Sequence, residues 1–184
     1  MPSNAPFGFK PYRHLSGGVI RAREYPIATG YATALCTGDP VKLASDGTIE
    51  LAAAGERILG VFQGVAYVDS GGNQVFTSRW PASTTATDIK ASVIDDKNVS
   101  FRVQSGGTPA QTNVGNLADH VTGTGSAYTG QSAAYLNATM GTGAAGFRIL
   151  GLIKEAGNSG EFAHVEVAVY EHEMSVDEPA TPGV

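Results

Sequence analysis

The chain has 184 residues, a formal net charge of −5 and one cysteine, and only 16% of its residues are charged. General nucleic-acid binding requires a basic face, so this acidic balance argues against it, and no run of about 20 apolar residues predicts a membrane span. One cysteine excludes an intramolecular disulfide, and the first 25 residues lack the apolar stretch of a signal peptide, so we expect a chain that folds in a cytosol.

The first predicted element is an unusual segment, "NAPFGFKPYRHLSGG", at positions 4–18. Aromatic and basic-type side chains are interspersed between its prolines: Phe7, Phe9, Lys10, Tyr12, Arg13 and His14. Prolines keep a chain extended and reduce the entropy lost on docking, and aromatic side chains give large, rigid contact areas. We therefore expect residues 1–25 to form an extended arm whose six side chains contact a partner. The alternative is that this segment folds back as a strand over the chain's own barrel.

Three segments after the arm have the alternation and the turn chemistry of β-hairpins. Over 39–53, apolar residues alternate with polar ones on either side of Asp46-Gly47, a favoured two-residue turn. The segment 57–80 contains two apolar runs about a Ser-Gly-Gly-Asn turn, and 89–104 has two alternating runs about an Asp-Asp-Lys-Asn turn. We expect each segment to form a hairpin of two paired strands.

The stretch 105–146 is rich in Gly, Thr, Ala and Ser and has few large apolar residues. Loops of this length are usually functional or covered by a partner, so we expect an insertion outside the barrel, with at most a helical turn near 116–121. A last hairpin is predicted over 147–173. The composition of 175–184 is typical of a flexible tail.

These patterns predict an all-β fold. No segment of 12 or more residues has the 3.6-residue apolar period of a helix. Short strands separated by closely spaced turns are typical of a barrel or a sandwich. We expect a single compact β domain over 26–174, with the extended arm before it and the long excursion inserted in it.

The two ends of the chain differ in charge. Residues 1–23 contain four cationic residues and no acid, whereas no Lys or Arg follows Lys154 and acidic residues accumulate there. Ends of opposite sign can steer subunits toward each other or toward a complementary surface. The alternative is that both are solvated tails whose charges aid solubility.

Few residues have the pattern of a catalytic or metal site. On a strand, His164 and Glu166 would share one face and could ligate a metal ion, but no third ligand is evident. Cys36 has the setting of a small, buried side chain rather than of an activated thiolate, and the identifiable aspartates occupy turns. No nucleophile elbow or phosphate-binding loop is present. We therefore expect no enzyme, no cofactor and no metal.

Five motifs in order carry a resemblance that extends from about position 4 to 172. They are "NAPFGFKPYRHLSGG", "TGDPVKLASDGTI", "RILGVFQGVAYVD", "ADHVTGTGSAYTGQS" and "RILGLIKE". In this order they resemble the head decoration, or cement, proteins of tailed bacteriophages. The resemblance implies a structural virion protein that assembles in the host cytoplasm, binds the capsid exterior and stabilises it by bridging subunits of the major capsid protein. It also implies a compact β domain, no catalysis and a trimer or dimer of the chain.

Two other functions are alternatives to capsid decoration. A carbohydrate- or host-surface-binding β module of a tail fibre or adhesin could use Trp80 and the tyrosines to stack on sugars. Trp80 precedes Pro81, however, and this position favours a strand end in the core or at its rim. A small hydrolase would need an unrecognised site built on His164 or His172.

Overall fold

The computed structural model describes residues 2–141 and 145–175, and these residues form an all-β protein, as the sequence patterns predict. Several antiparallel sheets pack together, and the described ranges contain no α-helix. A 3₁₀ turn at Gln111–Asn113 is the single helical element in these ranges. Accordingly, no helix in the described part of the chain is long and apolar enough to cross a membrane.

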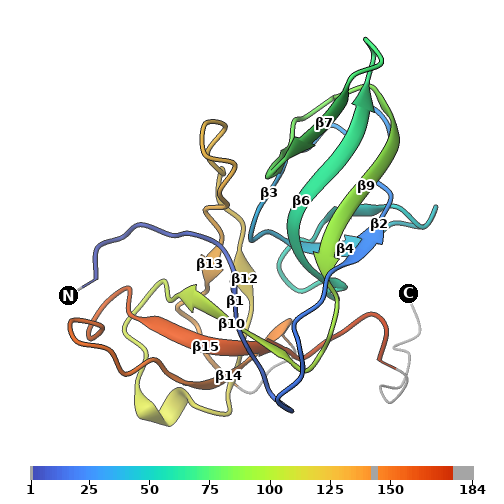
Figure 1. The fold of residues 1–184 in the computed structure, drawn as a ribbon. Helices are drawn as coiled ribbons and strands as arrows, with labels where there is room; N and C mark the ends of the chain where they lie inside the picture. Colours follow the sequence, from blue (N-terminus) through green and yellow to red (C-terminus); the bar gives the residue numbers. More distant parts are fainter. Residues whose placement is uncertain (1, 142–144, 176–184) are drawn as a thin grey trace.

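One part of the framework is a five-stranded antiparallel sheet, which lies in the lower half of Figure 1. Its strands in spatial order are β1 (Lys10–His14), β10 (Val99–Gln104), β15 (His164–Val169), β14 (Phe147–Leu152) and β11 (Leu117–Ala118). Strand β10 pairs with β1 on one side and with β15 on the other. The sheet therefore joins the first strand of the chain to its last one.

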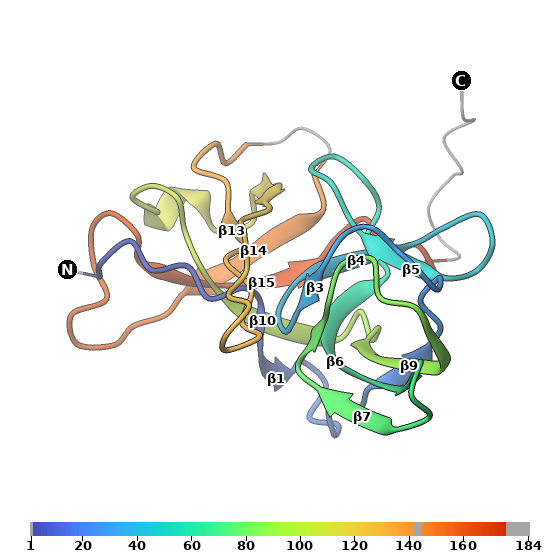
Figure 2. The same cartoon turned by 90° about the horizontal axis from the view of Figure 1, so that it is seen from above.

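The other part is a six-stranded antiparallel sheet. Its strands are β2 (Arg23–Tyr25), β9 (Ala86–Ile94), β6 (Gly60–Asp69), β4 (Pro40–Leu43) and β5 (Ile49–Leu51), with β7 (Gln74–Thr77) paired to β6. Figure 2 shows β4, β5, β6 and β9 curving around a common centre. The backbone N–H of Ile49 donates to the carbonyl of Pro26 at 2.9 Å, so the two ends of this sheet meet and the sheet closes toward a barrel.

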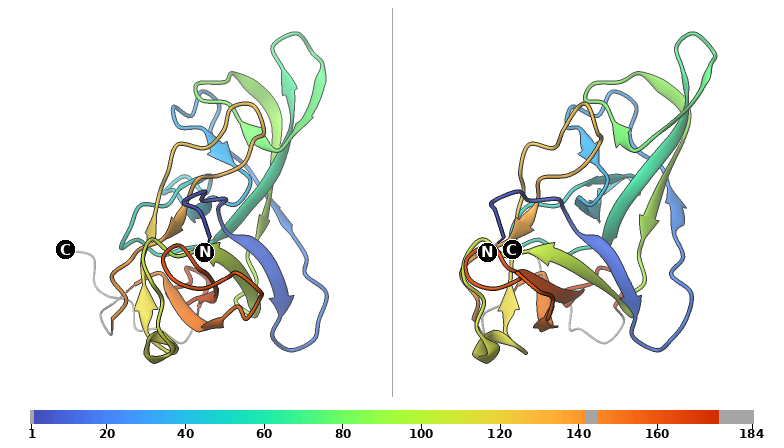
Figure 3. Two further views of the ribbon diagram at one scale, coloured as in Figure 1. Left: turned by 90° about the vertical axis from the view of Figure 1, so that its left-hand side faces the viewer. Right: turned by 60° about the vertical axis from the view of Figure 1, so that its left-hand side comes forward.

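Two short strand pairs complete the described structure. They are β3 (Leu35–Cys36) with β8 (Arg79–Trp80), and β12 (His120–Val121) with β13 (Tyr135–Leu136). Figure 3 shows that the β6–β7 hairpin extends farthest from the rest of the molecule. The β12–β13 connection forms a second projecting loop, which rises between the two larger sheets in Figure 1.

Three of the four predicted hairpins are confirmed: β4–β5, β6–β7 and β14–β15. The hairpin predicted over 89–104 is wrong, because β9 and β10 belong to different sheets. The turn at 95–98 carries the chain from one sheet to the other. Both strands alternate as a hairpin would, but Val93 and Phe101 are buried in different apolar clusters. Alternation of apolar and polar residues identifies a strand but does not determine which strand it pairs with.

Each large sheet has its own apolar cluster, and β6 contributes to both. Phe101 and Phe147 belong to the cluster against the five-stranded sheet, and Trp80 belongs to the cluster that the six-stranded sheet encloses. Val61 and Phe62 are neighbours on β6, and one side chain enters each cluster, as expected where successive side chains leave opposite faces of a strand. Strand β6 is therefore a wall common to the two clusters.

The expectation of an extended arm over 1–25 is wrong for the residues that follow Phe7. Strand β1 is paired within the five-stranded sheet, and β2 is paired within the six-stranded one. Phe9 is fully buried and stacks on Phe147, with ring centroids 4.3 Å apart. The alternative that the segment folds back onto its own barrel is what the structure has, because burying Phe9 removes a large apolar surface from water.

The expectation that 105–146 lies outside the core is also wrong for its described residues. Strands β11, β12 and β13 lie in this stretch, and Ala118, Ala134 and Leu136 are buried in the cluster of the five-stranded sheet. The helical turn expected near 116–121 is replaced by β11 and β12. Small residues in this stretch allow close packing of backbone segments. Positions 142–144 and, in the predicted flexible tail, 176–184 lie outside the described residues.

Candidate functional site

The structure divides the six predicted contact residues into one inward residue and five that reach the surface. Phe9 is in the core and is not available to a partner, which corrects its assignment as a contact residue. Phe7 is half-buried, with its ring edge-on to His164 at 5.0 Å between centroids. The ammonium of Lys10 lies 4.8 Å from the centre of the Phe7 ring, and Tyr12 is exposed. Of the three aromatic side chains in this segment, Phe9 is in the core, and Phe7 and Tyr12 reach the surface.

Arg13 is bound to the last strand of the chain. Its Nε and Nη2 donate to the two carboxylate oxygens of Glu166 at 2.6 and 2.9 Å. The Arg13 side chain is 61% exposed and that of Glu166 only 9%, so the arginine covers a carboxylate that water barely reaches. A register shift between Pro11 and Arg13 interrupts the pairing of β1 with β10, and such bulges re-aim side chains. The carboxylate of Glu166 raises the pKa of Arg13 through hydrogen bonding and charge attraction.

His14 organises the loop that follows β1. Its Nδ1 accepts hydrogen bonds from the backbone N–H groups of Ser16 and Gly18 at 3.3 and 3.1 Å. The proton of the ring therefore lies on Nε2, which donates to the carboxylate of Asp96 at 3.0 Å. Backbone N–H of Leu15 donates to the carbonyl of Asn98 at 2.7 Å. These bonds fix the loop against the turn at 95–98.

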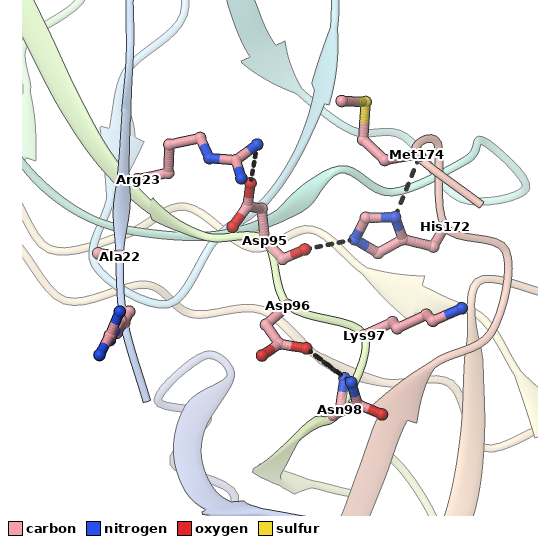
Figure 4. Close-up of a pocket in the computed structure, with 9 residues that line it drawn as sticks. Ala22, Arg23, Asp95, Asp96, Lys97, Asn98, His172 and Met174 are labelled. Carbon is pink, nitrogen blue, oxygen red and sulfur yellow. Dashed lines mark hydrogen bonds and ion pairs between the residues drawn. The ribbon is translucent and has the colours of Figure 1, made fainter. Parts of the chain in front are cut away.

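A groove of about 530 Å³ adjoins this loop. Three segments line it: 21–23, 95–98 and 172–174. Figure 4 shows the turn at 95–98 between Arg23 on one side and His172 and Met174 on the other. Sequence reasoning missed this groove because its walls are far apart along the chain and none contains a recognisable motif.

The acids of the groove are engaged by neighbours. Arg23 lies 3.2 Å from a carboxylate oxygen of Asp95, and the hydroxyl of Tyr25 donates to the same carboxylate at 2.6 Å. Asp96 accepts from the backbone N–H of Asn98 at 2.8 Å as well as from His14, and the bond from Asn98 is the main cause of its lowered pKa. Both carboxylates therefore already have partners within the protein.

Two cations of the groove differ from these acids. In the part of the chain that the structure describes, Arg21 and Lys97 have no hydrogen bond and no ion pair. Figure 4 draws Lys97 without a dashed line to any neighbour. The lining of the groove contains three cations, Arg21, Arg23 and Lys97, and two acids, Asp95 and Asp96, so its net charge is positive.

His172 builds one wall of the groove. Its Nδ1 accepts from the backbone N–H of Met174 at 3.1 Å, and its Nε2 donates to the carbonyl of Asp95 at 2.8 Å. Burial lowers the pKa of His172, so the ring is neutral and both nitrogens are occupied. This histidine holds the segment 172–174 against the turn at 95–98, and neither nitrogen is free for proton transfer or metal binding.

The two other histidines are also structural. Nδ1 of His164 accepts from Arg102 at 2.7 Å, and burial lowers its pKa. His120 is fully buried, its Nε2 donates to the carbonyl of Ala52 at 2.8 Å, and burial lowers its pKa. His164 and Glu166 are thus engaged by separate arginines. No group of three His, Cys, Asp or Glu residues in the described ranges is placed to hold a metal ion.

Buried polar groups near β3 are equally tied to the fold. Asp39 accepts from the backbone N–H of Cys36 at 2.7 Å and from the hydroxyl of Ser132 at 2.5 Å, and its burial raises its pKa. Cys36 is buried, and this burial raises the pKa of its thiol, which disfavours a thiolate nucleophile. Trp80 is fully buried in the core, so it offers no surface for a sugar.

Comparison of the chain with family models, with curated proteins and with solved structures finds no match. The surface formed by the loop 15–22 and the groove therefore has to be interpreted from its own chemistry. It combines exposed apolar side chains, unpaired cations and walls at 15–18 and 172–174 that hydrogen bonds hold to the turn at 95–98.

Proposed function

We propose that the protein is a structural virion protein that binds the exterior of a phage capsid and stabilises it by bridging subunits of the major capsid protein. The proposal rests on the ordered sequence motifs that resemble head decoration proteins and on the chemistry of one surface. It assigns the protein no catalytic role, and it assigns the loop 15–22 with its groove to contact with the shell.

One observation carries the proposal: large apolar side chains are exposed to solvent in the loop 15–22, in the strand before it and in the segment 172–174. Tyr12 and Leu15 are each 46% exposed, Val19 is 75% exposed and Met174 is 55% exposed. Leu15 is tied to Asn98 of the groove, and Met174 lines it. Exposed apolar patches mark interaction surfaces on soluble proteins. A surface fixed before binding loses little entropy when a partner docks.

The titratable groups support the same conclusion. The imidazoles of His14, His164 and His172 each use a nitrogen lone pair to accept a hydrogen bond from the protein, and the remaining one, His120, is sealed in the core. General acid–base catalysis needs a group that can reach the proton it transfers. A binding protein has no such requirement.

Stabilisation of a shell follows from linkage. A protein that binds the expanded lattice, and binds dissociated subunits less well, shifts the equilibrium toward the lattice. Many copies on one particle add their contributions, and several modest contacts joined through a dimer or trimer act together. We propose that further copies of the chain are partners in this way.

Co-sedimentation with expanded, undecorated phage heads tests the proposal. Removing the first 18 residues would also remove Phe9 from the core, so point variants at the surface are required. Tyr12→Ser combined with Val19→Ser should reduce binding, whereas Phe76→Ser on the distant β6–β7 hairpin is a matched control, since Phe76 is also highly exposed. Wild-type protein that remains in the supernatant, or a double variant that sediments like wild type, would count against the proposal.

A second candidate is a carbohydrate-binding module, and one observation favours it. Tyr128 is fully exposed at the β12–β13 loop, whose backbone N–H groups at 128 and 129 donate to the hydroxyl of Ser126. A rigidly presented aromatic ring can stack on a sugar. A glycan-array signal that Tyr128→Ala abolishes would favour this function over capsid binding.

A further inference from the structure

We propose that the groove beside β2 accepts an extended, acidic segment of the protein to which this chain binds. The identity of that protein as a capsid subunit rests on the proposed function. The chemistry of the occupant is argued from the groove itself: its unpaired charge, its free backbone and its fixed walls.

The charge of the groove favours an acidic occupant. The charged groups that line the groove are three cations and two acids, so a net positive charge remains. Arg23 is paired with Asp95, and the carboxylate of Asp96 accepts a hydrogen bond from His14. Arg21 and Lys97 are left without an anionic partner among the described residues. Complementary potentials favour an incoming segment that carries carboxylates. An acidic segment would give both cations the partners that their neighbours already have.

The backbone beside the groove is the second argument. Among the described residues, no backbone hydrogen bond joins Val19, Ile20 or Arg21 to another segment. These residues lead directly into β2, which lies at one end of the strand order of its sheet. Extended backbone with free N–H and C=O groups at a sheet edge is the template used in strand addition. An extended occupant can therefore bond to this backbone while its acidic side chains face Arg21 and Lys97.

The walls of the groove are the third argument, because they are held in place before any partner arrives. Two histidines hold them: His14 fixes the loop 15–18 to Asp96, and His172 fixes the segment 172–174 to Asp95. Both anchor points lie in the turn at 95–98. A site that needs no ordering loses less entropy on binding and therefore has a higher affinity. Ion pairs with Arg21 and Lys97 are then sufficient for a measurable complex.

Apolar side chains at the rim define the rest of the occupant. Val19 and Met174 are both largely exposed beside the groove. A segment in which acidic residues alternate with apolar ones places carboxylates on one side and apolar groups on the other. The preferred occupant is therefore an alternating acidic and apolar strand rather than a polyacidic tract.

A ten-residue synthetic peptide of alternating Glu and Val, with Thr at two Val positions for solubility, serves as the probe. Its affinity for the full chain is measured by fluorescence anisotropy at low and high salt, beside a peptide with Lys in place of Glu. The double variant Arg21→Gln/Lys97→Gln should weaken binding of the acidic peptide by about tenfold. Lys90→Gln is the matched control, because Lys90 is an exposed lysine on β9 next to Asp88.

The expected result is salt-sensitive binding of the acidic peptide alone, lost in the double variant and kept in the control. Equal binding of both peptides, or equal affinity of wild type and double variant, would overturn the proposal. Inorganic phosphate that displaces the peptide completely at low millimolar concentration would reduce the groove to a simple anion site and overturn it as well.

Two other occupants give distinct results, and each would overturn the proposal. If a chain ending at residue 175 binds the peptide and the full chain does not, the occupant is the chain's own acidic terminus. If the double variant converts a self-associated wild type into monomers in sedimentation equilibrium, the occupant is a second copy.

Head binding separates this inference from the proposed function. Wild type that sediments with heads while the double variant sediments equally well leaves the proposed function intact and defeats the inference. Wild type that does not sediment with heads defeats the proposed function, and the peptide titration then still decides whether the groove takes an acidic strand.

Discussion

The guanidinium of Arg13 donates two hydrogen bonds, of 2.6 and 2.9 Å, to the carboxylate of Glu166, which lies 153 positions later in the sequence. This pair joins the first strand to the last one over the strand β10 that separates them. One cation of the basic N-terminal segment is therefore paired with an acid of the acidic C-terminal segment within the same molecule. Only the charges that remain unpaired are available to steer a partner.

Replacing Arg13 should destabilise the protein, because Glu166 would lose two hydrogen bonds and its cation in a site that water barely reaches. We expect Arg13→Gln to lower the Tm by several degrees. The double variant Arg13→Gln/Glu166→Gln should have a smaller loss of Tm than Arg13→Gln alone. The matched control is Glu155→Gln, which removes an ion pair with Arg102 in which the carboxylate is 48% exposed rather than 9%. Thermal unfolding followed by circular dichroism measures all of them; equal Tm values for Arg13→Gln and Glu155→Gln would contradict the expected difference.

Phe9 and Tyr12 should differ sharply in stability, although both belong to the same aromatic segment. Phe9→Ala removes a fully buried ring that stacks on Phe147, so the free energy of unfolding should fall by about 3–5 kcal/mol. Tyr12→Ala removes an exposed side chain and should change it by no more than ~0.5 kcal/mol. Urea unfolding measures both, and a small effect of Phe9→Ala would mean that this ring is not in the core.

The alternation of aromatic and basic residues at 7–14 could not by itself reveal which rings are buried. Burial of Phe9 depends on Gly38, Ala134 and Phe147, which are far away in sequence. The hairpins about Asp46-Gly47 and the Ser-Gly-Gly-Asn turn were predictable, because local turn chemistry fixes both strands. The pairing of β10 with β1 and β15 is non-local, and local alternation carries no information about it.

The candidate site was predicted only in part for the same reason. Tyr12 and Arg13 were identified from the composition of their own segment. The groove brings Arg21, Lys97 and Met174 together from three distant segments, and no spacing within any one of them signals it. The one available signal was the absence of acids over residues 1–23, which leaves Arg21 without a local partner.

Asp39 should make stability depend on pH in a recognisable way. Burial raises its pKa in the folded protein, so the folded state holds the proton more tightly than the unfolded state does. Its contribution to stability is present below the unfolded pKa of about 3.9 and is lost as the pH rises through the higher folded pKa. Asp39→Asn keeps an acceptor for Cys36 and should gain stability relative to wild type across that range.

Urea unfolding of wild type and Asp39→Asn at several pH values measures this difference. Other carboxylates, such as Asp96 with its lowered pKa, act in the opposite direction, but they are common to both proteins and cancel. A stability difference that is constant with pH, or one that favours wild type increasingly as the pH rises, would contradict the assigned direction.

Gly8 should tolerate substitution less well than other glycines with positive φ. A Cβ at Gly8 would lie 2.7 Å from Cβ of Ser132 and 2.9 Å from the carbonyl oxygen of Gly38, whereas a Cβ at Gly47 meets nothing within 4 Å. Gly47→Ala should destabilise by about 1 kcal/mol from backbone strain alone. Gly8→Ala should cost ~3 kcal/mol because the steric overlap is added; equal losses in urea unfolding would show that the chain at Gly8 relaxes freely.

The proposal that this protein binds a capsid through the loop 15–22 and its groove is tested most directly by a cryo-electron microscopy reconstruction of expanded phage heads incubated with it. We expect ordered density for the β domain on the outer surface, with Val19, Arg21 and Met174 facing an acidic strand of a capsid subunit. Bare heads at saturating protein, or bound protein that presents this loop to solvent and contacts the shell through another face, would contradict it.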